Sequence, residues 1–189
     1  MFYKVKVAIS NRHVHLTKET YEKLFDEPLT VDRNLHQIGQ FAANQFVDLV
    51  TKDYTIEHVR IVGPFRSYDQ VEISKSDARK FKINPPVRTS GDLKGSESIT
   101  LRGPKGEVTL NEGCIIADRH VHFNTSDADT YGVKTGDKLK VHIMGEKRGT
   151  IEAFAKVSDD GYFELHIDTD DASAFLLNND DELILEIEN

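Results

Sequence analysis

The sequence carries one five-residue pattern twice, as Asn11-Arg12-His13-Val14-His15 and as Asp118-Arg119-His120-Val121-His122. In a β-strand, side chains two residues apart point to the same face, so both imidazoles of each copy can reach a single metal ion. One isolated His-x-His pair is more often a surface or core feature than a pair of ligands, but the repetition favours ligands. The two copies therefore predict two metal-binding strand ends.

The residues that follow each copy extend the pattern. Each His-x-His is followed by an apolar residue and a preferred helix N-cap, and the same order occurs at two further places. The four predicted N-caps are Thr17, Ser74, Asn124 and Asp168. Acidic residues lie three positions after three of these caps, where a carboxylate can return a capping bond: Asp77, Asp127 and Asp171. We therefore expect four strand ends that turn into short helices, each with a His or Glu at the corner.

These corners supply enough ligands for two metal sites. Glu72 and His166 each precede a cap in the same way as the second histidine of the two copies. Together with the two His-x-His pairs they give six ligands, which is three for each of two sites with an open position, as in catalytic zinc centres. The helix N-termini at the corners also favour phosphate or carboxylate groups. The single cysteine, Cys114, excludes a cysteine-rich structural zinc site and is expected to be a small buried residue.

Composition narrows the class of protein. The chain has 189 residues, a formal net charge of -8 and one cysteine, so it can form one large or two small domains without an intramolecular disulfide. The negative charge disfavours nucleic acid as a partner, and no apolar run is long enough to span a membrane. A local basic pocket for a small phosphorylated ligand remains open, with these candidate arginines: Arg12, Arg60, Arg66, Arg88, Arg102 and Arg119.

Short β-forming runs dominate the rest of the chain. They predict strands at 3–10, 46–50, 55–62, 98–102, 107–110, 138–143, 149–157, 162–167 and 182–187. Many short strands with polar or glycine-containing breaks are typical of barrels or sandwiches. The predicted fold class is mostly β with few, short helices.

Several motifs occur together in a fixed order along the chain. They are Ser10-Asn11-Arg12-His13-Val14-His15-Leu16, Gly63-Pro64 with Arg66, Gln70-Val71-Glu72-Ile73-Ser74, Pro85-Pro86-Val87-Arg88 with Ser90-Gly91-Asp92, Glu112-Gly113-Cys114, Arg119-His120-Val121-His122, and Glu164-Leu165-His166-Ile167-Asp168-Thr169-Asp170. In this order they resemble the PduL-type phosphotransacylases, which are phosphate propanoyltransferases. The resemblance extends from about Lys4 to about Ala174.

The resemblance implies two small β-barrels capped by helices and discontinuous in sequence. One barrel would comprise residues 1–11 plus 118–189, and the other residues 12–117 with an inserted segment near 26–46. It also implies two Zn²⁺ ions per chain. The second barrel would hold one ion through His13, His15 and Glu72, and the first would hold the other through His120, His122 and His166.

The activity implied is reversible transfer of a short acyl group, propanoyl or acetyl, between coenzyme A and inorganic phosphate. Substrates and products would be acyl-CoA, CoA, phosphate and acyl phosphate. Arg66 matches the family's phosphate-binding arginine, and the positions that match coenzyme A contacts are Ile9, Ser10, Asn11 and Arg60. Ser173 replaces the family's usual asparagine, which leaves one coenzyme A contact open.

The resemblance also bears on assembly and location. It implies a homodimer. Family members packaged in bacterial microcompartments often carry an amphipathic N-terminal extension, whereas this sequence begins almost directly at its first strand. The expectation is a cytoplasmic enzyme that is free or is packaged through partners.

Three alternatives use the same residues. A zinc-dependent thioester or phosphoester hydrolase would use the ions to activate water, and a non-catalytic module would only bind metal or anion. A cupin-type oxygenase is suggested by His13-x-His15-x-x-x-Glu19, but Glu19 falls in the first turn after the Thr17 cap, which disfavours it. The sequence does not determine the acyl-chain length. Metal identity is also open, since N and O ligands accept several divalent ions.

Overall fold

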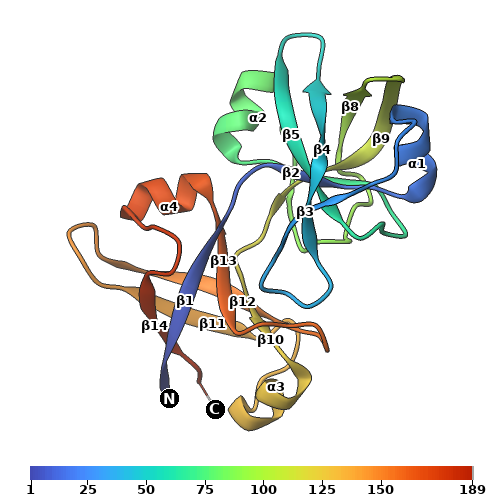
Figure 1. Cartoon of the computed structure of the whole chain (residues 1–189). Helices are drawn as coiled ribbons and strands as arrows, with labels where there is room; N and C mark the ends of the chain where they lie inside the picture. The colour runs from blue at the N-terminus through green and yellow to red at the C-terminus, as the bar shows by residue number, and fades with distance from the viewer. Residues whose placement is uncertain (189) are drawn as a thin grey trace. The chain divides into compact units, whose positions relative to one another are not determined.

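The computed structural model describes residues 1–188, which form two compact units (Figure 1). Unit 1 combines Met1–Ser10 with the chain from Asp118 onward, and unit 2 comprises Asn11–Ala117. No helix among the described residues is long and apolar enough to cross a membrane.

Unit 1 is a closed barrel of six strands in the order β1-β13-β10-β12-β11-β14. The strands are β1 (Phe2–Ser10), β10 (His120–Phe123), β11 (Lys138–Ile143), β12 (Gly149–Val157), β13 (Glu164–Asp168) and β14 (Glu182–Glu186). Helix α3 (Thr125–Tyr131) follows β10, and helix α4 (Thr169–Phe175) follows β13. Five strands of this barrel thus come from residues 120–186, and the remaining strand, β1, comes from the start of the chain.

Unit 2 also closes into a six-stranded ring. Its strands are β2 (His13–His15), β3 (Val31–Asn34), β4 (Phe41–Val50), β5 (Thr55–Gly63), β6 (Gln70–Glu72), β7 (Val87–Arg88), β8 (Glu97–Gly103) and β9 (Gly106–Ala117). The sheet runs β4-β5-β2-β6-β9, and β8 closes it by pairing with both β9 and β4. Helix α1 (Lys18–Leu24) follows β2 and helix α2 (Lys75–Phe81) follows β6, while β3 and β7 extend the sheet beyond the ring.

The two rings have the same topology. Strands β2, β4, β5, β6, β8 and β9 of unit 2 correspond in chain order to β10, β11, β12, β13, β14 and β1 of unit 1. Strand directions agree as well: β2 and β10 are antiparallel to β6 and β13, and parallel to β5 and β12. The prediction of a mostly β protein with short helices and two small barrels is confirmed.

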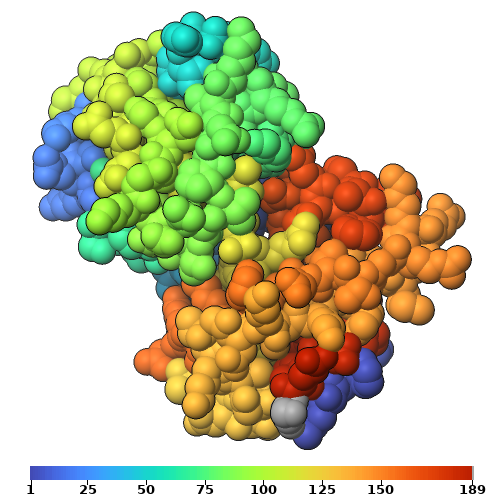
Figure 2. Space-filling view, turned by 180° about the vertical axis from the view of Figure 1, so that it is seen from behind, coloured from blue at the N-terminus to red at the C-terminus, as the bar shows by residue number. Residues whose placement is uncertain are grey.

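One connection differs between the rings. In unit 2, β8 and β9 form a hairpin whose turn lies between the paired residues Gly103 and Gly106. In unit 1, β14 and β1 pair in the same antiparallel way but are not consecutive in the chain. The Met1 amino group donates to the Ile187 carbonyl at 2.7 Å, and the Ile187 N–H donates to the Met1 carbonyl at 3.0 Å. The N-terminal segment accordingly lies against the C-terminal segment, blue beside red in Figure 2.

Alternating residues of the strands fill each barrel. Val5 and Val7 of β1 are buried with Leu165 of β13 in unit 1, and Val14 of β2 is buried with Val71 of β6 in unit 2. Because successive side chains of a strand point to opposite faces, the residues between them lie on the other face of the sheet. The histidines that flank Val14 are thereby placed together.

Some strand boundaries differ from the prediction. The segment near 26–46 contains β3, whose four residues are all exposed, and the first half of β4, whose buried residues include the small Ala42 and Ala43. Neither stretch has the large apolar alternation that marks a strand in sequence. Strand β9 runs on to Ala117 through an irregularity in its pairing with β8 near Gly113, whose φ of +138° suits glycine.

Candidate metal centres

All four predicted N-caps are present, each at the start of a seven-residue helix. The side chains of three of them, Thr17, Ser74 and Asp168, accept a bond from the backbone N–H three residues on. Asn124 instead accepts from the N–H of Ser126. Each cap lies two residues after a candidate ligand, so these ligands lie at or near the ends of strands that pair with a neighbour on both sides.

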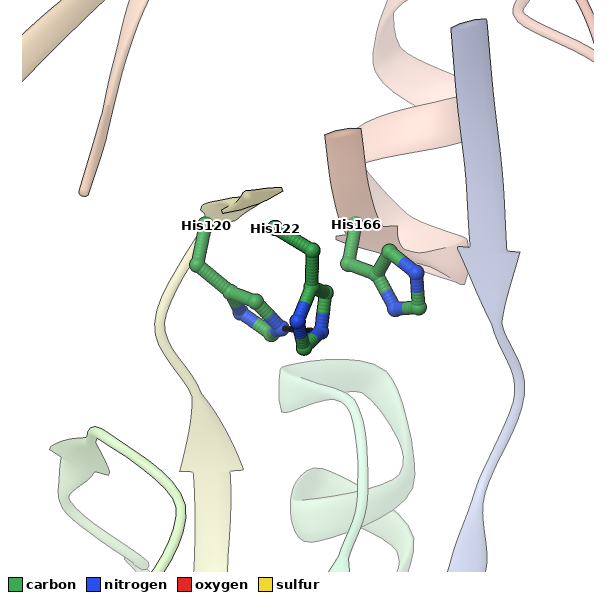
Figure 3. A group of neighbouring side chains, drawn as sticks. All are labelled: His120, His122 and His166. Carbon is green, nitrogen blue, oxygen red and sulfur yellow. Dashed lines mark hydrogen bonds between the residues drawn. The ribbon is translucent and has the colours of Figure 1, made fainter. Parts of the chain in front are cut away.

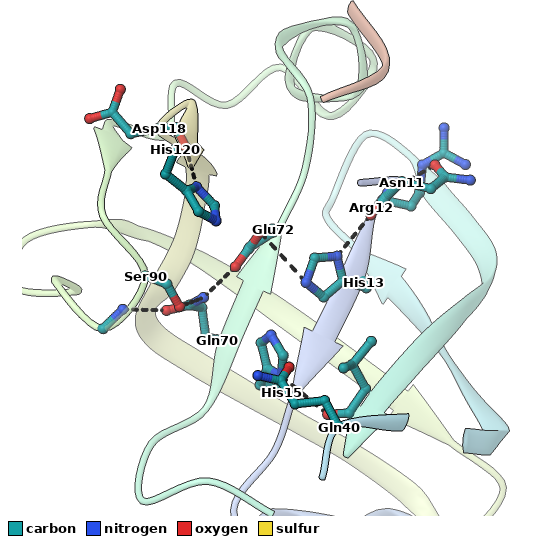
Figure 4. A network of polar contacts seen from close by, with 12 residues as sticks. Asn11, Arg12, His13, His15, Gln40, Gln70, Glu72, Ser90, Asp118 and His120 are labelled. Atoms are coloured by element: carbon teal, nitrogen blue, oxygen red, sulfur yellow. Dashed lines mark hydrogen bonds and ion pairs between the residues drawn. The ribbon is translucent and has the colours of Figure 1, made fainter. Parts of the chain in front are cut away.

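In unit 2, the structure brings together His13, His15 and Glu72 (Figure 4). His13 lies opposite Glu72 in the antiparallel pair of β2 and β6, with 3.5 Å between its Nε2 and the Glu72 Oε2. One ligand atom from each of the three residues lies within 4.8 Å of the others. This spacing suits a shared cation.

Unit 1 brings together His120, His122 and His166 in the same way (Figure 3). His120 lies opposite His166 in the antiparallel pair of β10 and β13. The Nε2 atoms of His120 and His122 are 3.1 Å apart, and the three residues again offer ligand atoms within 4.8 Å of one another. The two groups therefore lie on corresponding strands: β2 and β6 in unit 2, and β10 and β13 in unit 1.

Backbone carbonyls orient the histidine rings. The Nδ1 of His13 is 2.8 Å from the Asn11 carbonyl oxygen, and that of His120 is 2.7 Å from the Asp118 carbonyl oxygen. The Nδ1 of His15 contacts the Val62 carbonyl oxygen at 3.1 Å. A carbonyl can only accept, so Nδ1 donates and Nε2 keeps its lone pair for a ligand. Histidines that bind metals are commonly held by such carbonyl bonds, and the donor set fits a divalent ion.

Burial keeps the inner histidines neutral. It lowers the pKa of His15 to about 3, with the neighbouring charge of His13 as the next cause. Burial also lowers the pKa of His122 well below its ordinary value, with His120 and His166 contributing. Neutral imidazole is the form that binds metal, so these two histidines do not have to lose a proton before they accept a cation near pH 7.

Arg66 lies beside the unit 2 group. It belongs to the loop between β5 and β6, where its backbone N–H donates to the Leu16 carbonyl at 2.8 Å. Its positive charge is one of the causes that lower the pKa of His15. The buried Nε atom of Arg66 has no hydrogen-bond partner among the described residues, so the guanidinium has a donor available for an anion.

The residues matched to coenzyme A contacts are spread over both units. Ile9 lines an open pocket of unit 1 together with Ala172 and Ser173 of α4. Ser10 ends β1 opposite Asp168, and the Asn11 side chain accepts from the Arg12 N–H at 2.8 Å.

Arg60 belongs to unit 2 and already has partners there. Its Nη1 donates to Asp32 at 2.9 Å and to the Ala43 carbonyl at 2.6 Å, and its guanidinium lies 4.4 Å from the centre of the Phe46 ring. Arg60 is not among the residues that line the pocket beside Ile9.

Two arginine–aspartate pairs were missed by the reading of the sequence. Arg12 binds Asp77 through two bonds of 2.6 and 3.0 Å, and Arg119 binds Asp171 through two bonds of 2.7 Å. Both arginines are among the candidate phosphate ligands, and both aspartates are residues expected to return capping bonds. Each pair instead joins the start of the His-x-His strand to the helix that follows the third candidate ligand. The sequence does carry one sign of these pairs. The two arginines occupy the same position of the two five-residue patterns, and the two aspartates each lie three residues after an N-cap.

Cys114 is fully buried on β9, as predicted. Burial, followed by the charge of Glu97, raises the pKa of its thiol to about 12. A thiol with this pKa is almost entirely protonated near pH 7 and is a poor nucleophile.

These features define a two-barrel protein with a candidate divalent-metal centre in each barrel and an arginine beside one of them. A profile of the family described as phosphate propanoyltransferase matches residues 6–178. The chain is 45% identical over 179 residues to the phosphate propanoyltransferase of Thermotoga maritima, covering 93% of this chain and 85% of that protein. It is 46% identical to that of Priestia megaterium, covering 97% and 86%, and 44% identical to that of Salmonella typhimurium, covering 90% and 82%.

The chain therefore belongs to the phosphate propanoyltransferase family. It is accordingly an acyltransferase, and the family supports phosphate acyl transfer as its reaction.

Proposed function

We propose that the protein transfers a short acyl group, propanoyl or acetyl, reversibly between coenzyme A and inorganic phosphate, with two Zn²⁺ ions per chain. The observation that carries this proposal is the position of Arg66, a guanidinium with an available buried donor beside three ligand-type side chains. A cation and an arginine on one anion are a common arrangement for phosphate.

In this proposal the two groups divide the metal ions between them. His13, His15 and Glu72 hold one ion, and His120, His122 and His166 hold the other. A bound zinc ion supplies Lewis acidity to a carbonyl or phosphoryl oxygen.

The chain's own residues bind and orient the reactants. Arg66 donates to phosphate oxygens and holds the phosphate with one oxygen directed at the thioester carbonyl carbon. That oxygen forms the new C–O bond, the C–S bond breaks, and coenzyme A leaves as its thiolate while acyl phosphate is formed. Direct transfer needs no covalent intermediate on the protein, which agrees with the buried, protonated state of Cys114.

We assign the pocket beside the end of β1 to coenzyme A. It combines the apolar side chains of Ile9 and Leu176 with the hydroxyl of Ser173. Ser10 and Asn11 continue from Ile9 along the chain. Arg60 contributes in this proposal by exchanging Asp32 for a coenzyme A phosphate, an exchange that costs little because their ion pair is partly exposed.

Phosphate dependence tests the proposed reaction. Thiol release from propanoyl-CoA and acetyl-CoA is measured with and without phosphate, together with the formation of acyl phosphate. The transferase requires phosphate and forms one acyl phosphate per thiol released. Equal thiol release without phosphate would instead show a hydrolase. A series of acyl-CoA chain lengths then identifies the preferred group, and elemental analysis of the purified protein identifies the metal.

Assembly and location follow from the family resemblance. We propose a cytoplasmic homodimer, and light scattering of the purified protein tests the dimer. Fractionation of cells that form microcompartments tests whether the protein is packaged.

A further inference from the structure

Glu164 is a buried acid next to the unit 1 group. It lies on β13, two residues before His166, and only 3% of its surface is exposed. Its Oε2 is 3.2 Å from the Nε2 of His166. A buried acidic side chain is thus in direct contact with a candidate ligand.

The corresponding residue of unit 2 is Gln70. Glu164 lies opposite His122 in the pairing of β10 with β13, just as Gln70 lies opposite His15 in the pairing of β2 with β6. Gln70 is fully buried and donates to the Glu72 Oε1 at 2.7 Å. Its amide is fixed in turn by a bond to the Ser90 hydroxyl at 2.9 Å and by the Gly91 N–H at 2.8 Å (Figure 4). In each unit, therefore, the residue two positions before the third candidate ligand contacts that ligand.

The third candidate ligand and the residue two positions before it include one acidic residue in each unit, but the acidic residue is the ligand in unit 2 and the preceding residue in unit 1. Unit 2 has neutral Gln70 beside the carboxylate of Glu72, and unit 1 has the carboxylate of Glu164 beside neutral His166. The group of His120, His122 and His166 has no charge of its own when its rings are neutral. With Glu164 included, each unit has one carboxylate at this pair of positions.

We propose that Glu164 is a positioning residue for the unit 1 metal centre. A carboxylate only accepts, so the Nε2 of His166 carries the proton and donates to Glu164. The Nδ1 of His166 then keeps its lone pair for the metal. Glu164 thereby fixes the ring and tautomer of His166 and places an acidic side chain beside a group of three histidines. This inference rests on the proposed metal sites.

The test is zinc affinity measured by competition with a chromophoric chelator, on the full chain with both centres titrated. Wild type is expected to bind two zinc ions. Glu164→Gln is expected to weaken one of them by about 10- to 100-fold and to leave the other unchanged. The matched control is Glu152→Gln, which removes the same charge from an exposed position on β12 of the same barrel and should change neither affinity.

Cobalt substitution separates positioning from direct ligation. If Glu164 acts through His166, Co²⁺ bound to Glu164→Gln keeps the absorption envelope of wild type, because the ligand atoms are unchanged. A different envelope would show that Glu164 is itself a ligand and would overturn the proposal, as would an unchanged zinc affinity.

A second variant covers the case in which Glu164→Gln does not fold, as judged by circular dichroism. Glu164→Asp keeps the charge but withdraws the carboxylate from His166, and it should weaken the same zinc ion by a smaller factor. Wild-type affinity in a folded Glu164→Asp would contradict the inferred contact. Wild type that binds no zinc would instead refute the proposed zinc sites on which this inference rests.

Discussion

The two barrels share a ring of six strands but differ in the charged side chains of the loop that leads to the third candidate ligand. The loop from β5 to β6 and the loop from β12 to β13 make equivalent bonds, from the Arg66 N–H to the Leu16 carbonyl and from the Ser158 N–H to the Phe123 carbonyl. The first loop presents the cationic Arg66. The second contains Asp159, whose carboxylate accepts from the Thr125 hydroxyl at 2.5 Å. The shared backbone fixes where the candidate ligands lie, and only the first of these two loops adds a cationic side chain.

The largest expected effect is loss of a candidate ligand at matched positions, through His13→Ala in unit 2 and His120→Ala in unit 1. Each variant should bind one metal ion in place of two, measured by elemental analysis. Each should also lower kcat by about 10³-fold or more, since losing even one electrostatic contact to a transition state costs about 10²–10³-fold. The control is His142→Ala, which removes a histidine that is bonded to Glu186 at 2.7 Å and belongs to neither group. Wild-type turnover in one ligand variant would show that only the other centre is catalytic.

Replacing Arg66 tests whether anion binding belongs to unit 2. Arg66→Gln should lower kcat/KM for phosphate by about 10²-fold, because a charged donor to the phosphate is lost, while both metal ions stay bound. Initial rates over a range of phosphate concentrations measure this. Arg102→Gln is the matched control, since Arg102 is exposed and paired with Glu107 at 2.6 Å. Equal losses in the two variants would mean that Arg66 acts only through general charge.

The arginine–aspartate pairs allow a stability comparison of the two units. Arg12→Gln should lower the free energy of unfolding by about 3 kcal/mol, because it leaves the Asp77 side chain, only 2% exposed, with a weaker set of partners. Arg119→Gln should cost about 1.5 kcal/mol, since the Arg119 and Asp171 side chains are 39% and 18% exposed. Denaturant titrations of both variants measure the difference, and a larger loss for Arg119→Gln would reverse the predicted order.

The smallest effect concerns the C-cap residue directly after the helix that follows the third ligand strand. Lys82 caps α2 with a φ of +56°, and Leu176 caps α4 with a φ of +57°, although glycine is favoured there. Lys82→Gly should raise the free energy of unfolding by about 0.5 kcal/mol, after the larger entropy of the unfolded glycine chain is deducted. Lys82→Ala shortens the side chain without relieving the backbone and should give no gain. A gain in the alanine variant would assign the effect to the lysine side chain.

The sequence predicted the parts of this protein that repeat. The His-x-His copies and their N-caps are local patterns, so the four capped corners could be located without knowing which strands pair. Arg12 and Asp77 are far apart in sequence and meet only because β2 pairs with β6, so no local pattern reveals their bond. Strand β3 and the start of β4 were missed because exposed and small residues give no apolar alternation. Glu164 lies within one of the motifs, but its burial beside His166 depends on the closed barrel, which no local pattern reveals.

In unit 1, no turn joins the two strands that correspond to the β8–β9 hairpin, and this has a consequence for circular permutation of the chain. The turn between Gly103 and Gly106 joins β8 to β9, whereas the corresponding strands β14 and β1 meet through the paired backbones of Met1 and Ile187. A circular permutant that joins these ends by a short turn, and opens the chain between Ser10 and Asn11, would make each barrel contiguous. During synthesis of a chain with this strand order, unit 2 can close as soon as residue 117 has emerged. The first strand must wait for the last one before unit 1 can close.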